Sequence, residues 1–116
     1  MLELLRTGTA QEIVQEVIDN YLPKYREKGI CKGEAVFASC LYYRPTDGHV
    51  CVIGHFADGL LNGEYGPIDH HCTKLGIPYH SNRMYFLKQL QQLHDHNELL
   101  DLERLQRLAE RYEGAF

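Results

Sequence analysis

The feature that most constrains the fold is a Pro-Thr-Asp-Gly break at 45–48, which lies between two apolar runs. The runs are AVFASCLYY at 35–43 and HVCVIGHFA at 49–57, and both contain β-branched and aromatic residues. Two such runs on either side of an Asp-Gly pair are a strong signal for a β-hairpin. The sequence therefore predicts a central hairpin over 35–57.

The length of the turn determines which residues of the hairpin face each other. A two-residue loop places Cys51 opposite Arg44, whereas a four-residue loop at 45–48 places it opposite Tyr42. In the second register Cys40 is only a diagonal neighbour of Cys51, with about 7–8 Å between the α-carbons. A disulfide prefers about 5.5–6 Å, so neither register predicts a bridge.

A helix is predicted before the hairpin. Thr9 and Glu12 have the spacing of a capping box, in which each side chain binds the backbone N–H of the other residue. Apolar residues then recur at helical spacing as far as Leu22. Because Pro23 lacks a backbone N–H, we expect the helix to end or kink there, with 24–28 as an added final turn.

Three helices are predicted after the hairpin. Pro67 and Gly76 suit the start and end of a short helix. Ser81 can cap a longer helix that runs to about His96, and Asp101 can cap the last one. Both longer helices carry an apolar stripe, formed by Tyr85, Phe86, Leu90 and Leu93 in one and by Leu102, Leu105, Leu108, Ala109 and Tyr112 in the other. The order of elements indicates one α+β domain over 1–116.

The composition is ordinary for a soluble globular chain, with 44% hydrophobic and 24% charged residues. The formal net charge of −4 argues against a nucleic-acid partner, and Arg104, Arg107 and Arg111 alternate with acids as on a solvated helix face. No apolar run approaches the length of a membrane span. The first residues, MLELLRTGTAQE, do not form a secretory signal. We therefore expect a cytoplasmic protein with reduced cysteines.

Cysteine and histidine are numerous enough to raise the question of a metal site. Structural zinc sites usually take ligands from tight pairs such as C-x2-C, and no two cysteines here have that spacing. A zinc-stabilised or metal-dependent module remains an alternative, in which a bend of the chain joins Cys51 and His55 to His71 and Cys72. The other interpretation is that the cysteines of the chain fill the core, as free cysteines commonly do.

Catalytic signatures are weaker still. A thiol nucleophile needs a nearby base, which His49 or His55 could supply to Cys51, and His71 to Cys72. No protease or transferase motif surrounds either cysteine, and both common phosphate-binding glycine motifs are missing from the sequence. The chain is therefore expected to bind a partner rather than to catalyse a reaction.

Two segments supply candidate binding residues. Adjacent residues of a strand face opposite sides, so one of Tyr42 and Tyr43 can present a surface beside Arg44, and exposed Tyr and Arg are enriched in binding hot spots. His94 and Asp95 could form a ligand-binding or catalytic dyad. Alternatively, they mark a helix C-terminus, where imidazoles favour the negative end of the helix dipole.

The same two segments carry a resemblance. One contributes Cys40, Tyr42, Arg44, Asp47, Gly48, Cys51, Ile53 and Gly54, and the other contributes Phe86, Leu87, Leu90, Gln91, His94 and Asp95. Together they resemble a group of small uncharacterised proteins from bacteriophages, prophages and bacteria. The resemblance implies a phage or prophage source and the binding of a host component. It also implies that Gln91, His94 and Asp95 pack against the hairpin, through Arg44, as an architectural network or as the wall of a pocket.

The expected function is that of a non-enzymatic phage or prophage accessory protein. It would bind a host macromolecule, in counter-defence or regulation, through Tyr42, Tyr43 and Arg44 or through its acidic helix faces. One alternative is the zinc module described above. The other is a binder of a small, nucleotide-type ligand in a pocket formed by Arg44, Tyr42, Gln91 and His94. A homodimer through the leucines of 99–108 is a further option.

Overall fold

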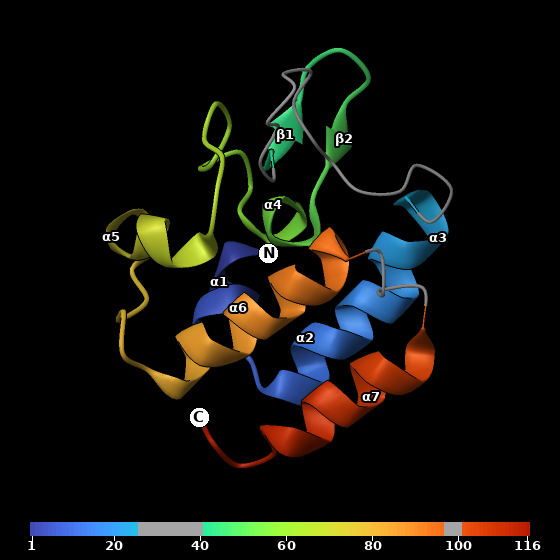
Figure 1. The fold of residues 1–116 in the computed structure, drawn as a ribbon, viewed down its shortest axis with the longest axis vertical. Coiled ribbons are helices and arrows are strands. Elements are labelled where there is room, and N and C mark those ends of the chain that lie inside the picture. The colour runs from blue at the N-terminus through green and yellow to red at the C-terminus, as the bar shows by residue number, and fades with distance from the viewer. Residues whose placement is uncertain (26–40, 97–100) are drawn as a thin grey trace.

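The structure, a computed structural model, describes residues 1–25, 41–96 and 101–116 (Figure 1). Helices make up most of this part of the chain, and the β-hairpin projects at one end of its long axis. The predicted α+β class, with an N-terminal helix, a central hairpin and C-terminal helices, is confirmed.

A short helix that the sequence did not predict opens the chain. This helix, α1 (Leu2–Thr7), buries Leu5, and its end is held by Arg83. The Arg83 guanidinium donates to the carbonyls of Leu5 at 3.1 Å and Gly8 at 2.6 Å. Six residues are too few to show a helical period, so contacts with the rest of the fold, this one and the burial of Leu5 among them, stabilise α1.

The next helix, α2 (Ala10–Glu16), begins as predicted. The Thr9 hydroxyl accepts from the N–H of Glu12 at 3.1 Å, and the Glu12 carboxylate accepts from the N–H of Thr9 at the same distance. The capping box is therefore confirmed, and the helix buries Ile13 and Val14 against the core.

The helical path continues through Pro23. A π-helix, η1 (Val17–Tyr21), follows α2, and α3 (Leu22–Tyr25) follows η1. The N–H of Leu22 bonds to the carbonyl of Val17, five residues earlier. The wider turn accommodates a proline that has no N–H to donate and whose ring crowds the preceding turn. The predicted break is thus a π-helix, and the rest of the predicted final turn lies outside the described residues.

The hairpin has the four-residue loop of the second predicted register. Strand β1 (Tyr43–Arg44) pairs with β2 (His49–Val50), with Tyr43 opposite Val50 and Arg44 opposite His49. The N–H of Cys51 then bonds to the Tyr42 carbonyl at 3.3 Å. Cys51 thus lies opposite Tyr42, as that register requires. The first part of the predicted hairpin, 35–40, lies outside the described residues.

The predicted second strand is wrong beyond Val50, because the chain forms a helix there. This helix is α4 (Val52–Phe56), and the Cys51 thiol caps it by accepting from the N–H of Gly54 at 3.3 Å. A Cβ added at Gly54 would lie 2.1 Å from the Tyr42 carbonyl oxygen. Only glycine therefore lets α4 lie directly against the strand that precedes the turn.

The short helix predicted between Pro67 and Gly76 is present in two parts. A 3-10 helix, η3 (Ile68–His71), leads into α5 (Cys72–Leu75). Gly76 ends α5 in the left-handed conformation, with φ of 73°. The predicted stop is therefore confirmed.

Both C-terminal helices begin at their predicted caps. Ser81 caps α6 (Asn82–Asp95) by accepting from the N–H of Met84, and Asp101 caps α7 (Leu102–Arg111). The predicted apolar stripes are wrong at two positions, because the side chains of Tyr85 and Leu102 are each 42% exposed.

The helices pack around one core. Helix α7 lies along α2, while α6 packs against α4, η3 and α7 (Figure 1). The largest fully buried side chains include Tyr42, Phe56, Phe86, Leu5, Ile13 and Leu22. The apolar stripe of α7 therefore closes the core with Leu105 and Leu108, and a homodimer through this segment stays a prediction.

Within the described ranges, the helices are all too short or too polar to cross a membrane.

Candidate functional site: a groove between α6 and α7

The two predicted segments meet through Tyr42 and Gln91. The Gln91 amide nitrogen donates to the Tyr42 hydroxyl and to the Gly66 carbonyl, both at 3.1 Å. Its amide oxygen accepts from the N–H of Ile68 at 2.7 Å, and the Tyr42 hydroxyl donates to Gly66 at 2.6 Å. Both side chains are buried. They fasten the hairpin and η3 to α6, so this part of the predicted site is architectural.

Arg44 binds an acid of its own turn. Its guanidinium pairs with Asp47 in the same turn, with Nε–Oδ1 at 3.0 Å and Nη2–Oδ2 at 2.7 Å. Tyr43 is half-buried beside it. The predicted contact between Arg44 and the α6 motif stays a prediction, as does the pocket expected among Arg44, Tyr42, Gln91 and His94.

His94 lies in the core at the end of α6, 3% exposed. Its Nδ1 is 3.2 Å from the Asp95 carboxylate, and its ring packs edge-on against Tyr21 at 6.3 Å between centroids. Burial of this imidazole favours the interpretation of a packed helix C-terminus over that of an accessible dyad.

The four predicted zinc ligands take separate partners. Cys51 is buried as the cap of α4, and His55 faces the Glu16 carboxylate at 3.0 Å. His71 lies 3.0 Å from the Tyr65 carbonyl, and the Cys72 thiol donates to the Asp69 carbonyl at 3.1 Å. Among the residues that the structure describes, no group of three or more metal-binding side chains could hold an ion. Cys31 and Cys40 lie outside them.

The environment of Cys72 is unfavourable for a nucleophile. Burial, and then the nearby charge of Asp69, raise the pKa of the Cys72 thiol. A nucleophilic cysteine needs the opposite shift, because the thiolate is the reactive form.

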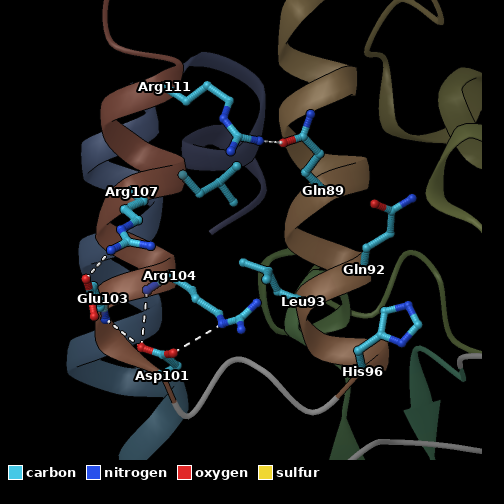
Figure 2. A pocket seen from close by; sticks show the side chains of 10 residues that line it. Gln89, Gln92, Leu93, His96, Asp101, Glu103, Arg104, Arg107 and Arg111 are labelled. Atoms are coloured by element: carbon cyan, nitrogen blue, oxygen red, sulfur yellow. Dashed lines mark hydrogen bonds and ion pairs between the residues drawn. The ribbon is translucent and has the colours of Figure 1, made fainter.

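A groove of about 670 Å³ lies between α6 and α7 (Figure 2). This volume falls in the range of about 300–1,000 Å³ that ligand sites occupy. Leu93 and Leu108 are the apolar residues of its lining, and the other lining side chains are polar or charged: Gln89, Gln92, His96, Asp101, Glu103, Arg104, Arg107 and Arg111.

Two of the groove's arginines are held by acids of their own helix. Asp101 accepts from the backbone N–H of Glu103 and of Arg104, and its other oxygen lies 3.2 Å from the Arg104 guanidinium. The Arg107 guanidinium pairs with Glu103 one turn earlier. These side chains are between 46% and 68% exposed. Such exposed pairs contribute little stability, about 0–1 kcal/mol, so an incoming anion can displace the carboxylates at small cost.

Arg111 is held differently, by a neutral group on the facing helix. Its guanidinium donates to the Gln89 amide oxygen at 2.8 Å, which bridges α7 and α6 (Figure 2). The Gln89 amide nitrogen in turn donates to the Tyr112 hydroxyl at 2.7 Å, and the Tyr112 ring packs edge-on against Phe86 at 5.5 Å. The Arg111 side chain is thus positioned while its charge has no carboxylate partner among the described residues.

The charge of the groove is opposite to that of the chain. Three arginines and two carboxylates line it, so the lining has one positive charge in excess with His96 neutral, whereas the chain carries −4. Guanidinium groups present planar, paired donors that match carboxylate and phosphate oxygens. The groove can therefore bind anions.

The sequence contains a signal for this site, but the same signal fits a solvated helix face. Arg104, Arg107 and Arg111 recur at three- and four-residue intervals, which puts them on one side of a helix. Their spacing does not reveal that this side faces α6, because the pairing of the two helices is set by the fold.

Comparison of the chain with models of protein families, with curated proteins and with solved structures gives no match. The resemblance to small phage and prophage proteins stays a prediction, and the function is argued from the site alone.

Proposed function

We propose that this protein is a non-enzymatic binding protein, and that it recognises an acidic segment of a partner protein in the groove between α6 and α7. The observation that carries the proposal is the gathering of Arg104, Arg107 and Arg111 on one groove of a net acidic chain. Recognition of acidic motifs by arginine clusters is a recurrent mode of peptide binding.

The form of the groove supports a chain segment as the occupant. Its arginines lie along one helix at positions 104, 107 and 111, so they span about two turns, or about 10 Å. A row of cations of that length matches several acidic side chains of an extended or helical segment. The apolar side chains of Leu93 and Leu108 add a surface for an apolar side chain of the same segment.

The resemblance to phage and prophage proteins bears on the identity of the partner. With that source, the partner we propose is a protein of the host cytoplasm, whose binding serves counter-defence or regulation. The excess positive charge of the groove favours acidic over basic segments as its ligands, because like charges brought together oppose association.

The test uses a fluorescein-labelled deca-glutamate peptide and measures fluorescence anisotropy at low salt. The double variant Arg107→Gln/Arg111→Gln removes two groove cations, and Arg44→Gln with Arg6→Gln is the control with the same charge change outside the groove. We expect binding by the wild type and by the control, and at least a tenfold loss in the groove variant, about 1.4 kcal/mol. Equal losses in both variants would show that only net charge matters.

A further inference from the structure

The groove holds two carboxylate-bound arginines beside one arginine that no described carboxylate neutralises. Arg104 and Arg107 each already bind an acid of their own helix, while Arg111 binds the Gln89 amide. A ligand carboxylate at Arg104 or Arg107 would replace a contact of the same chemistry. A carboxylate therefore adds less affinity at these two arginines than at Arg111, where no carboxylate among the described residues has to be displaced.

A ligand group with two negative charges gains more from binding the arginines than a carboxylate does. Arg107 and Arg111 are four residues apart on α7, so their stems are neighbours on the helix surface. A phosphate group carries about −1.5 to −2 charges at neutral pH and three strong acceptor oxygens. It can therefore accept from both guanidinium groups at once, whereas one carboxylate offers two oxygens and a single charge.

The structure also shows what positions the second guanidinium. Gln89 holds Arg111 at 2.8 Å, and Tyr112 holds Gln89 at 2.7 Å. A phosphate oxygen that reaches Arg111 meets a side chain already ordered toward the groove, which lowers the entropy cost of binding.

We infer that the acidic segment carries a phosphorylated side chain, and that its phosphate binds between Arg107 and Arg111. This inference rests on the proposed function and narrows it. The phosphate belongs to a residue of the partner protein, since the row of arginines extends one further turn to Arg104, where flanking acidic side chains of the same segment can bind.

The test compares three fluorescein-labelled decapeptides that differ only at one central position: phosphoserine, serine or glutamate, each flanked by two glutamates on either side. Anisotropy titrations are made with the wild type, with Arg111→Gln and with the control Arg44→Gln. Inorganic phosphate is a fourth probe, added as a competitor. Far-ultraviolet circular dichroism confirms that each variant is folded.

The phosphoserine peptide should bind the wild type at least about tenfold more tightly than the glutamate peptide, as one or two additional charge-assisted hydrogen bonds would give. The ratio of the affinities for the phosphoserine and glutamate peptides should fall to nearly one in Arg111→Gln and stay unchanged in Arg44→Gln. Equal binding of the phosphoserine and glutamate peptides would overturn the phosphate inference and leave the proposed function standing. The phosphate inference would also be overturned if the preference for the phosphoserine peptide survived in Arg111→Gln. The same holds if millimolar inorganic phosphate bound while every peptide failed to bind. Failure of all three peptides would remove the proposed function itself.

Discussion

The hydroxyl oxygen of Tyr42 lies 3.1 Å from the amide nitrogen of Gln91, and both groups are buried where the hairpin meets α6. The Gln91 amide also binds the backbone of Gly66 and Ile68. One side chain of α6 thus satisfies polar groups of two segments that are distant from it in sequence, the hairpin and 66–68, so this residue pair holds the three parts of the fold together.

Removal of the Gln91 amide should destabilise the protein more than removal of the Tyr42 hydroxyl. Gln91→Leu leaves the buried N–H of Ile68 without its acceptor, which costs about 2–3 kcal/mol. Tyr42→Phe removes a hydroxyl while Gln91 still binds Gly66, and should cost about 1 kcal/mol. Urea unfolding of both variants and the double variant measures the coupling energy. A coupling near zero would contradict a shared network.

Gly54→Ala should be among the most destabilising single changes in α4. The added methyl group would meet a backbone oxygen, that of Tyr42, at 2.1 Å, and backbone cannot move aside as a flexible side chain can. We expect a loss of about 3 kcal/mol, the upper part of the range for overpacking. Gly63→Ala is the control, because φ there is 84° but no atom lies within 4 Å, and it should cost about 1–2 kcal/mol. Equal losses at the two sites would show that close packing is not the cause at Gly54.

Cys72 should be alkylated slowly in the folded protein. Burial and the charge of Asp69 raise the pKa of its thiol, so less thiolate is present at pH 8 than for a thiol in the unfolded chain. Iodoacetamide modification, resolved by site with mass spectrometry, should show a pH midpoint above that of the urea-unfolded protein. Asp69→Asn should lower the midpoint, because it removes the negative charge. A midpoint equal to that of the unfolded chain would contradict the assigned environment.

The capping box of α2 should contribute a pH-dependent part of the stability. Hydrogen bonds from the Thr9 backbone and hydroxyl lower the pKa of Glu12 in the folded state. A group with a lowered folded pKa contributes stability above its unfolded pKa of about 4.3, and this stability is lost as the pH falls through the folded pKa. Glu12→Gln should therefore flatten the stability profile below about pH 5, measured by urea unfolding between pH 3 and 7. Thr9→Ala should cost about 1 kcal/mol at pH 7. If the free energy of unfolding of Glu12→Gln fell at acid pH as steeply as that of the wild type, the Glu12 carboxylate would not contribute to the pH dependence of stability.

Local signals in the sequence predicted the parts of the fold that local interactions determine. The caps at Thr9, Ser81 and Asp101 and the stop at Gly76 are all present. Each depends on a side chain or a backbone angle within one helical turn, so neighbouring residues are enough to specify it.

Tertiary packing decided the elements that the sequence did not predict. The apolar run after Val50 is too short for its period to separate a strand from a buried helix, and the Cys51 cap and the contact of Gly54 with Tyr42 favour the helix. Tertiary packing also decided the contacts of the candidate site. The α6 motif meets the hairpin as predicted, through Gln91 and Tyr42, while Arg44 pairs with Asp47 in its own turn.

The most direct test of the account is the location of an acidic ligand on the folded protein. Backbone amide chemical shifts of the ¹⁵N-labelled protein should be followed while deca-glutamate is added at low salt. We predict saturable shifts in α7 and in residues 89–96 of α6, with the hairpin at 43–50 unchanged. Shifts confined to the hairpin, or weak shifts spread over the whole surface, would contradict the groove between α6 and α7 as the binding site.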